Sequence, residues 1–417
     1  MLHQPAISLP KCESKLQPPI AIICGASATG LGVARDLGRE GVPVMLADTE
    51  ADRPAFGSRY CNTHQQSLVA PTAEELWPRV IEFARKQDHS PVLIATSDVF
   101  ASSVAEHYEK LSQHVQIVGC HPNVDLFVNK ERFYEFCVAA NVPVPQTAFP
   151  KTRNDLLDAT RDFDFPIILK PIIGHLWRER LHGKKLLVAN SQADVAKISA
   201  RFGDDVEGLM VQQMIPGRDE NIWIAGLYAD QQSKIQQCFV GRKLRQFPVG
   251  FGSATLAKGE FCQEVERLSR IIIERSRFHG ICGTEFKFDP RDQTYKAIEV
   301  NPRPTLWFSL IRQSGVAVNY HAYCEAARIP APHSSPQIDG RKWLMFEKDL
   351  ISSAKMALAG QMSPWSYFRS LRGVSARAIF DTNDLQPSFW ALGHYARKFV
   401  QRVSSRMNLF KVKGGQR

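Results

Sequence analysis

Short apolar runs alternate with amphipathic stretches along the first 125 residues. Residues 20–24 (IAIIC) are apolar and precede the sequence GASATGLG, and a helix-like stretch leads from there to a second apolar run, residues 42–47. A strand, a glycine turn, a helix and a second strand are typical of a βαβ unit. Two further strand-like runs follow, at residues 91–96 and 115–118. After a polar leader, residues 1–18, we therefore expect residues 19–125 to form an α/β domain with an open, parallel, Rossmann-like sheet.

The pattern changes after residue 125. A helical stretch at residues 130–140 is closed by VPVP, and one long amphipathic helix is predicted at residues 260–278. Short strand-like runs fill most of the remainder, at residues 166–171, 186–189, 209–213, 222–228, 234–240, 283–288 and 295–300. Residues 126–330 are thus predicted to form an α+β domain. The sequence PAPHSSP is typical of a linker, and the region beyond it, residues 331–417, is predicted to be mostly helical.

Composition narrows the class of protein. A chain of 417 residues suggests about three domains, and 44% hydrophobic with 23% charged residues is typical of a globular protein. The nine cysteines include no C-x-x-C pair, which argues against a disulfide framework and a zinc site and favours a cytoplasmic protein with reduced thiols. No apolar run is long enough to span a membrane, and the N-terminal sequence does not resemble a secretory signal.

The net charge of +10 is concentrated at the C-terminus, where residues 388–417 contain seven basic residues and no acidic one. Six apolar residues recur there at helical spacing: Leu392, Tyr395, Phe399, Val403, Met407 and Phe410. Two interpretations remain open. The tail is either a helix packed on the body or a basic amphipathic helix in peripheral contact with an anionic membrane, at its inner face. No nucleic-acid-binding motif is present, so nucleic acid is not an expected partner.

The first glycine loop is ambiguous. Gly25, Gly30 and Gly32 lie where a phosphate-binding turn belongs, but Ser27 replaces the middle glycine of G-x-G-x-x-G, and no Walker A lysine is present. Asp48 ends the next strand, as the ribose-binding acid of a dinucleotide fold would. A dehydrogenase site, a purely structural turn and a contact to an anionic substrate are the alternatives.

The segment 283–307, GTEFKFDPRDQTYKAIEVNPRPTLW, predicts two strands joined by a turn. Because alternate residues of a strand share a face, Glu285 and Glu299 are expected to lie side by side, with Asn301 nearby. Two carboxylates and an amide oxygen suit Mg²⁺, with Mn²⁺ as an alternative. Arg303 follows, and its guanidinium matches a phosphoryl or carboxylate group. The competing interpretation is a hairpin whose acids face solvent.

The motif E-F-K-x-D, a turn, and Y-K-x-I-E-V-N-P-R-P resembles the metal-binding hairpin of the ATP-grasp superfamily, in particular the branch that contains D-aspartate ligase. The resemblance covers residues 20–330 and implies an ATP-grasp fold preceded by the open sheet. It implies that Glu285, Glu299 and Asn301 bind a metal ion that bridges the phosphates of ATP. Lys130 and Lys170 (in PIILKP) would then be the two lysines that contact the nucleotide.

The same resemblance implies a nucleotide pocket. In VQQMIP, Gln213, Met214 and Ile215 would hold the adenine, and Glu220 would meet the ribose. The loop GHLWRERLHGKKLLV lacks the glycine-rich run of many relatives but offers Lys184 and Lys185 to cover ATP.

The sequence RKLR at residues 242–245 resembles a segment beside the transferred phosphate, which implies a catalytic role for Arg245. The resemblance also implies catalytic roles for Lys170 in PIILKP and for Arg303 in the hairpin motif. The implied reaction uses ATP to activate a small-molecule carboxylate as an acyl phosphate, which an amine then attacks. A kinase acting on a hydroxyl and an ATP-binding scaffold without turnover are the alternatives. Gly25–Gly32 and Thr96-Ser97-Asp98 are candidate contacts for the second substrate, although the latter could equally form a helix N-cap.

Overall fold

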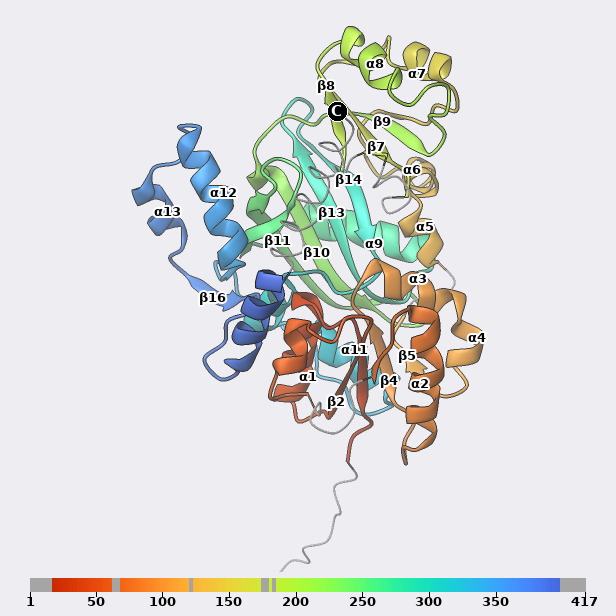
Figure 1. The fold of residues 1–417 in the computed structure, drawn as a ribbon, viewed down its shortest axis with the longest axis vertical. Helices are drawn as coiled ribbons and strands as arrows, with labels where there is room; N and C mark the ends of the chain where they lie inside the picture. Colours follow the sequence, from red (N-terminus) through yellow and green to blue (C-terminus); the bar gives the residue numbers. More distant parts are fainter. Residues whose placement is uncertain (1–16, 62–67, 120–122, 174–179, 182–184, 398–417) are drawn as a thin grey trace, which may run out of the picture.

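The structure is a computed structural model, and it describes residues 17–397 except 62–67, 120–122, 174–179 and 182–184. Three sheets organise the chain (Figure 1). The open parallel layer and the two mainly antiparallel sheets agree with the α/β and α+β fold class expected from the sequence. None of the helices in these described ranges is long and apolar enough to cross a membrane.

The N-terminal layer is a five-stranded parallel sheet with the order β3-β2-β1-β4-β5. Its strands are β1 (Ala21–Cys24), β2 (Val44–Asp48), β3 (Leu68–Val69), β4 (Val92–Ala95) and β5 (Gln116–Ile117). Its helices are α1 (Ala28–Arg39), α2 (Ala73–Arg85), α3 (Asp98–Glu106) and α4 (Tyr108–Leu111). Both faces are covered: Ile23 belongs to the core shared with α1, and Ile22 to the core shared with α2. Burial on both faces explains why these strands are continuous apolar runs.

A seven-stranded sheet with the order β14-β13-β10-β11-β12-β15-β16 forms the centre of the molecule. Its strands are β10 (Ile222–Ala229), β11 (Ile235–Phe247), β12 (Ser253–Gly259), β13 (Gly280–Asp289), β14 (Thr294–Asn301), β15 (Lys342–Leu344) and β16 (Val374–Arg377). The long helix α9 (Gln263–Ser276) packs its apolar face on β10 and β11, and α5 (Val124–Val128) and α6 (Lys130–Ala139) complete that core.

A smaller sheet with the order β6-β9-β7-β8 lies above the β13–β14 hairpin in Figure 1. Its strands are β6 (Thr147–Ala148), β7 (Ile167–Pro171), β8 (Leu187–Ala189) and β9 (Leu209–Gln213). The helices α7 (Arg153–Ala159) and α8 (Gln192–Ser199) give this lobe its own core. The candidate site lies where the two antiparallel sheets meet.

The C-terminal region is less purely helical than its sequence predicts. It contains α12 (Phe346–Leu358), α13 (Pro364–Ser370) and a helical segment at 386–397, but β15 and β16 join the central sheet. Two further helices, α10 (Phe308–Gln313) and α11 (Val318–Ala326), precede it. Asp384 fastens the region to the N-terminal layer, because its carboxylate accepts hydrogen bonds from Arg35 and Ser58. Most of the predicted basic tail and leader lies outside the described residues.

Candidate active site

Glu285 on β13 and Glu299 on β14 are direct cross-strand partners. Gly283 is paired with Asn301 in the same register, so the three predicted metal ligands gather at one end of the hairpin. The register shifts just beyond Glu285, which leaves Ile298 without a partner at that step. The expectation that the two carboxylates lie side by side is therefore confirmed.

A lysine that was not among the predicted site residues completes this cluster. Lys243 on β11 lies with Nζ 2.7 Å from Oε1 of Glu285, and both side chains are largely buried. On the other carboxylate, Oε1 of Glu299 accepts a hydrogen bond of 3.2 Å from Nδ2 of Asn301. Lys243 belongs to the RKLR segment at residues 242–245. The sequence therefore indicated the correct segment, but the residue predicted from it was Arg245.

The pKa values of the two carboxylates are shifted in opposite directions. Burial raises the pKa of Glu285, and the nearby charge of Glu299 raises it further, although Lys243 opposes both effects. Burial also acts to raise the pKa of Glu299, but the positive charges of Lys130 and Lys243 outweigh it, and the net pKa is lowered. Positive charge on several sides thus opposes the effect of burial on the pKa of both acids.

Lys170 on β7 is buried, and this burial lowers its pKa to about 7. The neighbouring charge of Lys130 lowers the pKa as well, whereas Glu299 and Glu285 act against the shift. Its Nζ donates to Oε1 of Gln212 at 3.0 Å and lies 5.6 Å from the ring centre of Tyr134. Lys130, at the start of α6, donates from Nζ to the backbone oxygen of Ile172. A buried lysine with so low a pKa marks a place where an anion would be stabilised.

The predicted adenine segment follows β9. Gln213 is buried, and its side chain donates to Asp164 and accepts from Arg291. Met214 is half-buried and Ile215 is buried. The backbone oxygen of Ile215 accepts a hydrogen bond of 2.7 Å from Nζ of Lys287 on β13, which ties this segment to the metal-binding hairpin.

Glu220, the acid expected at the ribose, and its neighbour Asp219 differ in their exposure and in their partners. Glu220 lies in the short 3-10 helix η2 (Asp219–Asn221) and is exposed. Asp219 is only partly exposed and accepts hydrogen bonds from the backbone and side-chain nitrogens of Gln246. Burial raises the pKa of Asp219, and the charges of Lys243 and Lys287 act against that shift. The order of the two acids in GRDENI did not distinguish them.

Arg303 connects the hairpin to the N-terminal layer. Its Nη2 donates to Oδ1 of Asn301 at 3.1 Å, and its Nε donates to Oδ1 of Asp98 at 2.7 Å. Asp98 is the first residue of α3, and Ser97 before it accepts a hydrogen bond from the backbone nitrogen of Phe100. The helix N-cap interpretation of this segment is thus confirmed for Ser97.

The first glycine loop has the geometry of a tight structural turn. A side chain at Gly30 would place its Cβ 1.8 Å from the backbone oxygen of Gly25, so the turn and α1 approach too closely for any other residue. The carboxylate of Asp48 binds the protein backbone, because it accepts hydrogen bonds from the backbone nitrogens of Ala26, in the glycine loop, and Glu50. These contacts favour the structural interpretation over a dinucleotide site.

Arg245, for which the sequence predicts a catalytic role, is bound by residues of the C-terminal helices. Its guanidinium forms two hydrogen bonds with the carboxylate of Asp349 on α12, at 2.9 and 2.8 Å, and donates to Oγ of Ser370. The β11–β12 register shifts between Lys243 and Arg245. Alternation along the strand therefore does not place these two residues on the same face, and Arg245 faces the C-terminal helices.

The loop between β7 and β8 is described only in part. Lys184 lies outside the described residues. Lys185 is exposed, and its charge is close enough to act against the raised pKa of Glu285. This position is compatible with a covering role for the end of the loop.

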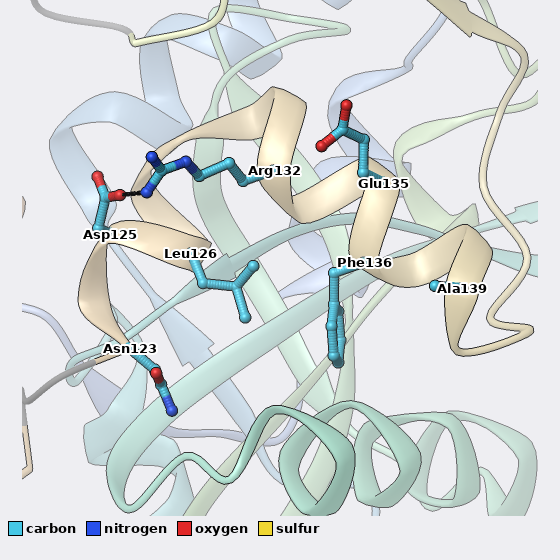
Figure 2. A pocket seen from close by; sticks show the side chains of 7 residues that line it. All are labelled: Asn123, Asp125, Leu126, Arg132, Glu135, Phe136 and Ala139. Atoms are coloured by element: carbon cyan, nitrogen blue, oxygen red, sulfur yellow. Dashed lines mark hydrogen bonds and ion pairs between the residues drawn. The ribbon is translucent and has the colours of Figure 1, made fainter.

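A separate surface pocket of about 640 Å³ is lined by residues of α5 and α6 and by Asn123 just before α5. Figure 2 shows Leu126 and Phe136 directed toward α9, with the Asp125–Arg132 ion pair at one edge. The pocket is lined by Asn123, Asp125, Leu126, Arg132, Glu135, Phe136 and Ala139. None of these is a candidate site residue, so the pocket is distinct from the carboxylate–lysine cluster.

Comparisons with known proteins agree with this geometry. No family model matches the chain. It is 25% identical over 224 residues to D-aspartate ligase of Enterococcus faecium (strain Aus0004), covering 51% of this chain and 53% of that protein. The chain thus spans about half the length of this relative. It is also 21% identical over 289 residues to the carbamoyl phosphate synthase large chain of Methanothermobacter thermautotrophicus, covering 66% of this chain and 26% of that one.

Solved structures share the fold over a longer span. An ADP complex of N5-carboxyaminoimidazole ribonucleotide synthetase superposes with a TM-score of 0.59 at 14% identity, covering 77% of this chain and 80% of that one. A biotin carboxylase from Campylobacter jejuni, in a β-γ-ATP complex, gives a TM-score of 0.61 at 14% identity, covering 78% and 74%. These likenesses establish a common fold.

Proposed function

We propose that this chain, whose fold is that of the ATP-grasp superfamily, is an ATP-dependent carboxylate–amine ligase that forms ADP. The observation that supports the proposal best is the partly buried pair Glu285 and Glu299, near which lie Lys130, Lys170 and Lys243. A carboxylate oxygen of the substrate attacks the γ-phosphorus of ATP, and the bond to the ADP oxygen breaks. The nitrogen of an amine then attacks the carbonyl carbon of the acyl phosphate, phosphate leaves with the electron pair of the C–O bond, and the nitrogen loses a proton.

The donor set suits a divalent metal ion. Glu285, Glu299 and the side-chain oxygen of Asn301 are hard oxygen ligands, and they lie together at one end of the hairpin. The low pKa of Glu299 keeps one of them ionised. Mg²⁺ bound there would supply positive charge to the phosphates of ATP.

The lysines provide the remaining positive potential. Lys170 and Lys130 lie on the side of the small sheet, and Lys243 lies on the central sheet. An anionic phosphate would favour the protonated form of Lys170, whose pKa of about 7 leaves it poised between two states at neutral pH. Residues that stabilise charge in a site shielded from water are the main catalytic device for phosphoryl transfer.

Arg303 is placed to orient the acyl substrate. Its guanidinium joins Asn301 of the metal-binding end to Asp98 of the N-terminal layer, so a carboxylate bound there would lie beside the metal ligands. A planar guanidinium binds a carboxylate in a bidentate manner. The second substrate would therefore enter between the hairpin and the N-terminal layer.

The test is ADP and phosphate release from Mg-ATP, with pools of carboxylates and amines, by the wild-type chain and Glu299→Gln. Asp292→Asn, at the exposed turn of the same hairpin, is the matched control. We expect release that needs both substrates, that falls on the order of 10²–10³-fold in Glu299→Gln and that is unchanged in Asp292→Asn.

Three other results would contradict the ligase. ADP release with a hydroxyl compound and no free phosphate identifies a kinase. AMP as the product excludes acyl phosphate chemistry of this type. ATP binding without turnover on any substrate pool favours a scaffold.

A further inference from the structure

Exposed apolar side chains gather at the C-terminal end of the described chain. Of the nineteen large hydrophobic side chains that are exposed in the described residues, twelve lie between positions 346 and 395. They are Phe346, Leu350, Ile351, Leu358, Trp365, Phe368, Phe380, Leu385, Phe389, Trp390, Leu392 and Tyr395. Single exposed hydrophobic residues are normal, whereas several on one face of a helix indicate an interaction surface.

The helices α12 and α13, residues 346–370, form a helical arm that stands at the side of the central sheet (Figure 1). The residues of α12 that are buried are polar: Asp349, Ser352 and Ser353. Asp349 binds Arg245, and Ser352 donates to the backbone oxygen of Gln246 on β11. A surface helix normally does the reverse and buries its apolar face.

The outer face of the arm is apolar instead. Phe346, Leu350 and Leu358 recur at intervals of four or eight residues, so they lie on one side of α12. Leu358 is 91% exposed, Trp365 is 70% exposed and Phe368 is 64% exposed. In α13 no residue is buried. The outward apolar face therefore lacks a partner within the described chain.

The charges of residues 346–395 indicate what kind of partner could bind the apolar face. Each of its acidic residues is engaged by another side chain: Glu347 with Tyr395, Asp349 with Arg245, Asp381 with Arg39, and Asp384 with Arg35. The exposed charges are basic and are carried by Lys355, Arg369, Arg372 and Arg377. Of these, Arg369 in α13 and Arg372 just beyond it add positive charge next to the apolar residues of the arm, whereas Nζ of Lys355 lies over the ring of Phe247 on β11 and Arg377 lies over the ring of Phe380.

Two candidate occupants fit this surface poorly. A second copy of the chain would bring the same basic side chains against it, and like charges in an interface disfavour association. The sequence of residues 398–417 is basic without any acidic residue, so this segment would also be repelled. The complementary partner is apolar and negatively charged.

We propose that the outer face of the helical arm docks on the surface of an anionic phospholipid bilayer. Trp365 and Phe368 enter the interface between headgroups and acyl chains, where aromatic side chains are favoured. Arg369 and Arg372 contact the headgroup phosphates. Because Asp349 fastens α12 to β11, docking holds the carboxylate–lysine cluster near the bilayer.

Co-sedimentation of the full chain with vesicles tests this proposal. We expect binding to phosphatidylcholine vesicles that contain phosphatidylglycerol, and little binding to phosphatidylcholine alone. The double variant Trp365→Ser, Phe368→Ser should lose at least about tenfold in partitioning, because two aromatic side chains no longer leave water. Val138→Ser, at an exposed apolar residue of α6, is the matched control and should bind like the wild type.

A chain that ends at residue 397 separates the arm from the basic tail. It should retain binding that remains sensitive to the double substitution. Binding that depends on the tail alone, equal binding to neutral vesicles, or no binding at all overturns the proposal. So does a wild-type dimer that the double variant converts to a monomer, because the face would then be an interface between copies. Equal thermal unfolding temperatures for all variants exclude misfolding as the cause.

Discussion

Lys243 and Glu285 form a buried ion pair at the centre of the candidate site, with Nζ and Oε1 2.7 Å apart. Glu285 is a predicted metal ligand, so the lysine occupies one of the oxygens that a divalent cation would use. The pair satisfies both charges in the absence of a ligand, since a lone buried charge would be costly. A metal ion at Glu285 and the ammonium of Lys243 therefore compete for the same carboxylate.

Replacing Lys243 with methionine should separate metal binding from turnover. Without the competing ammonium, we expect the variant to bind Mn²⁺ more tightly than the wild type in the absence of nucleotide, as measured by electron paramagnetic resonance. Its rate of ADP formation should fall on the order of 10²–10³-fold, because a charge near the phosphates is lost. Lys258→Met, on the neighbouring strand β12, is the control. Weaker Mn²⁺ binding in Lys243→Met would contradict the competition.

Because the pKa of Lys170 is low, we expect the protein to take up a proton when it binds ATP. That pKa lies near 7, so the wild-type side chain is mostly neutral at pH 8. The phosphates of ATP should raise that pKa and draw a proton from the buffer. Calorimetric titration at pH 8 in two buffers of different ionisation enthalpy measures the uptake, which Lys170→Met should abolish. An unchanged proton count in the variant would assign the uptake to another group.

The low pKa of Lys170 should also make the free energy of unfolding depend on pH. The pKa of Lys170 is lowered from 10.5 to about 7 in the folded chain, so between these values the unfolded chain binds more protons. The free energy of unfolding should therefore rise with pH over this interval through this group. Relative to the wild type, Lys170→Met should lose its stability advantage as the pH increases from 7 to 10. Urea unfolding at several pH values checks this, and a difference that grows with pH would contradict it.

Arg245 should affect stability more than chemistry. Arg245→Met leaves the buried carboxylate of Asp349 without its cationic partner, with only the hydrogen bond from the hydroxyl of Thr255, and breaking a buried ion pair in this way typically costs about 3–5 kcal/mol in the free energy of unfolding. The double variant with Asp349→Leu should recover much of that loss, because no uncompensated charge remains. Urea unfolding measures both variants. Unchanged stability together with loss of ADP formation would restore the catalytic role that the sequence predicts.

Arg303 should control the binding of the acyl substrate. Arg303→Ala removes the group that joins Asn301 to Asp98, and we expect KM for the carboxylate to rise about tenfold or more while KM for ATP changes little. Asp98→Asn, which weakens only the link to the N-terminal layer, should have a smaller effect. Equal increases in both KM values would indicate that Arg303 supports the whole site instead.

The local sequence pattern was sufficient to predict many of the secondary-structure elements of this chain. The parallel layer follows from apolar runs separated by glycine and helical stretches, and the pairing of Glu285 with Glu299 follows from strand alternation around a short turn. Such features depend on residues near one another in sequence, whose geometry the backbone restricts. The resemblance of the hairpin motif to a known family then supplied the fold.

Contacts across long sequence separations were decided by tertiary structure alone. A register shift in β11 directs Lys243 and not Arg245 toward the carboxylates, and a single-residue irregularity of this kind has no sequence signature here. The link from Asp98 to Arg303 joins residues 205 positions apart. The inverted burial of α12 depends on the partners that β11 offers to Asp349 and Ser352. The sequence by itself determined the secondary-structure elements and the pairing of Glu285 with Glu299. The packing of those elements decided which lysine and arginine side chains lie beside the two acids. The reason is that the direction of a side chain depends on strand register and on neighbours that the chain brings together only when it is folded.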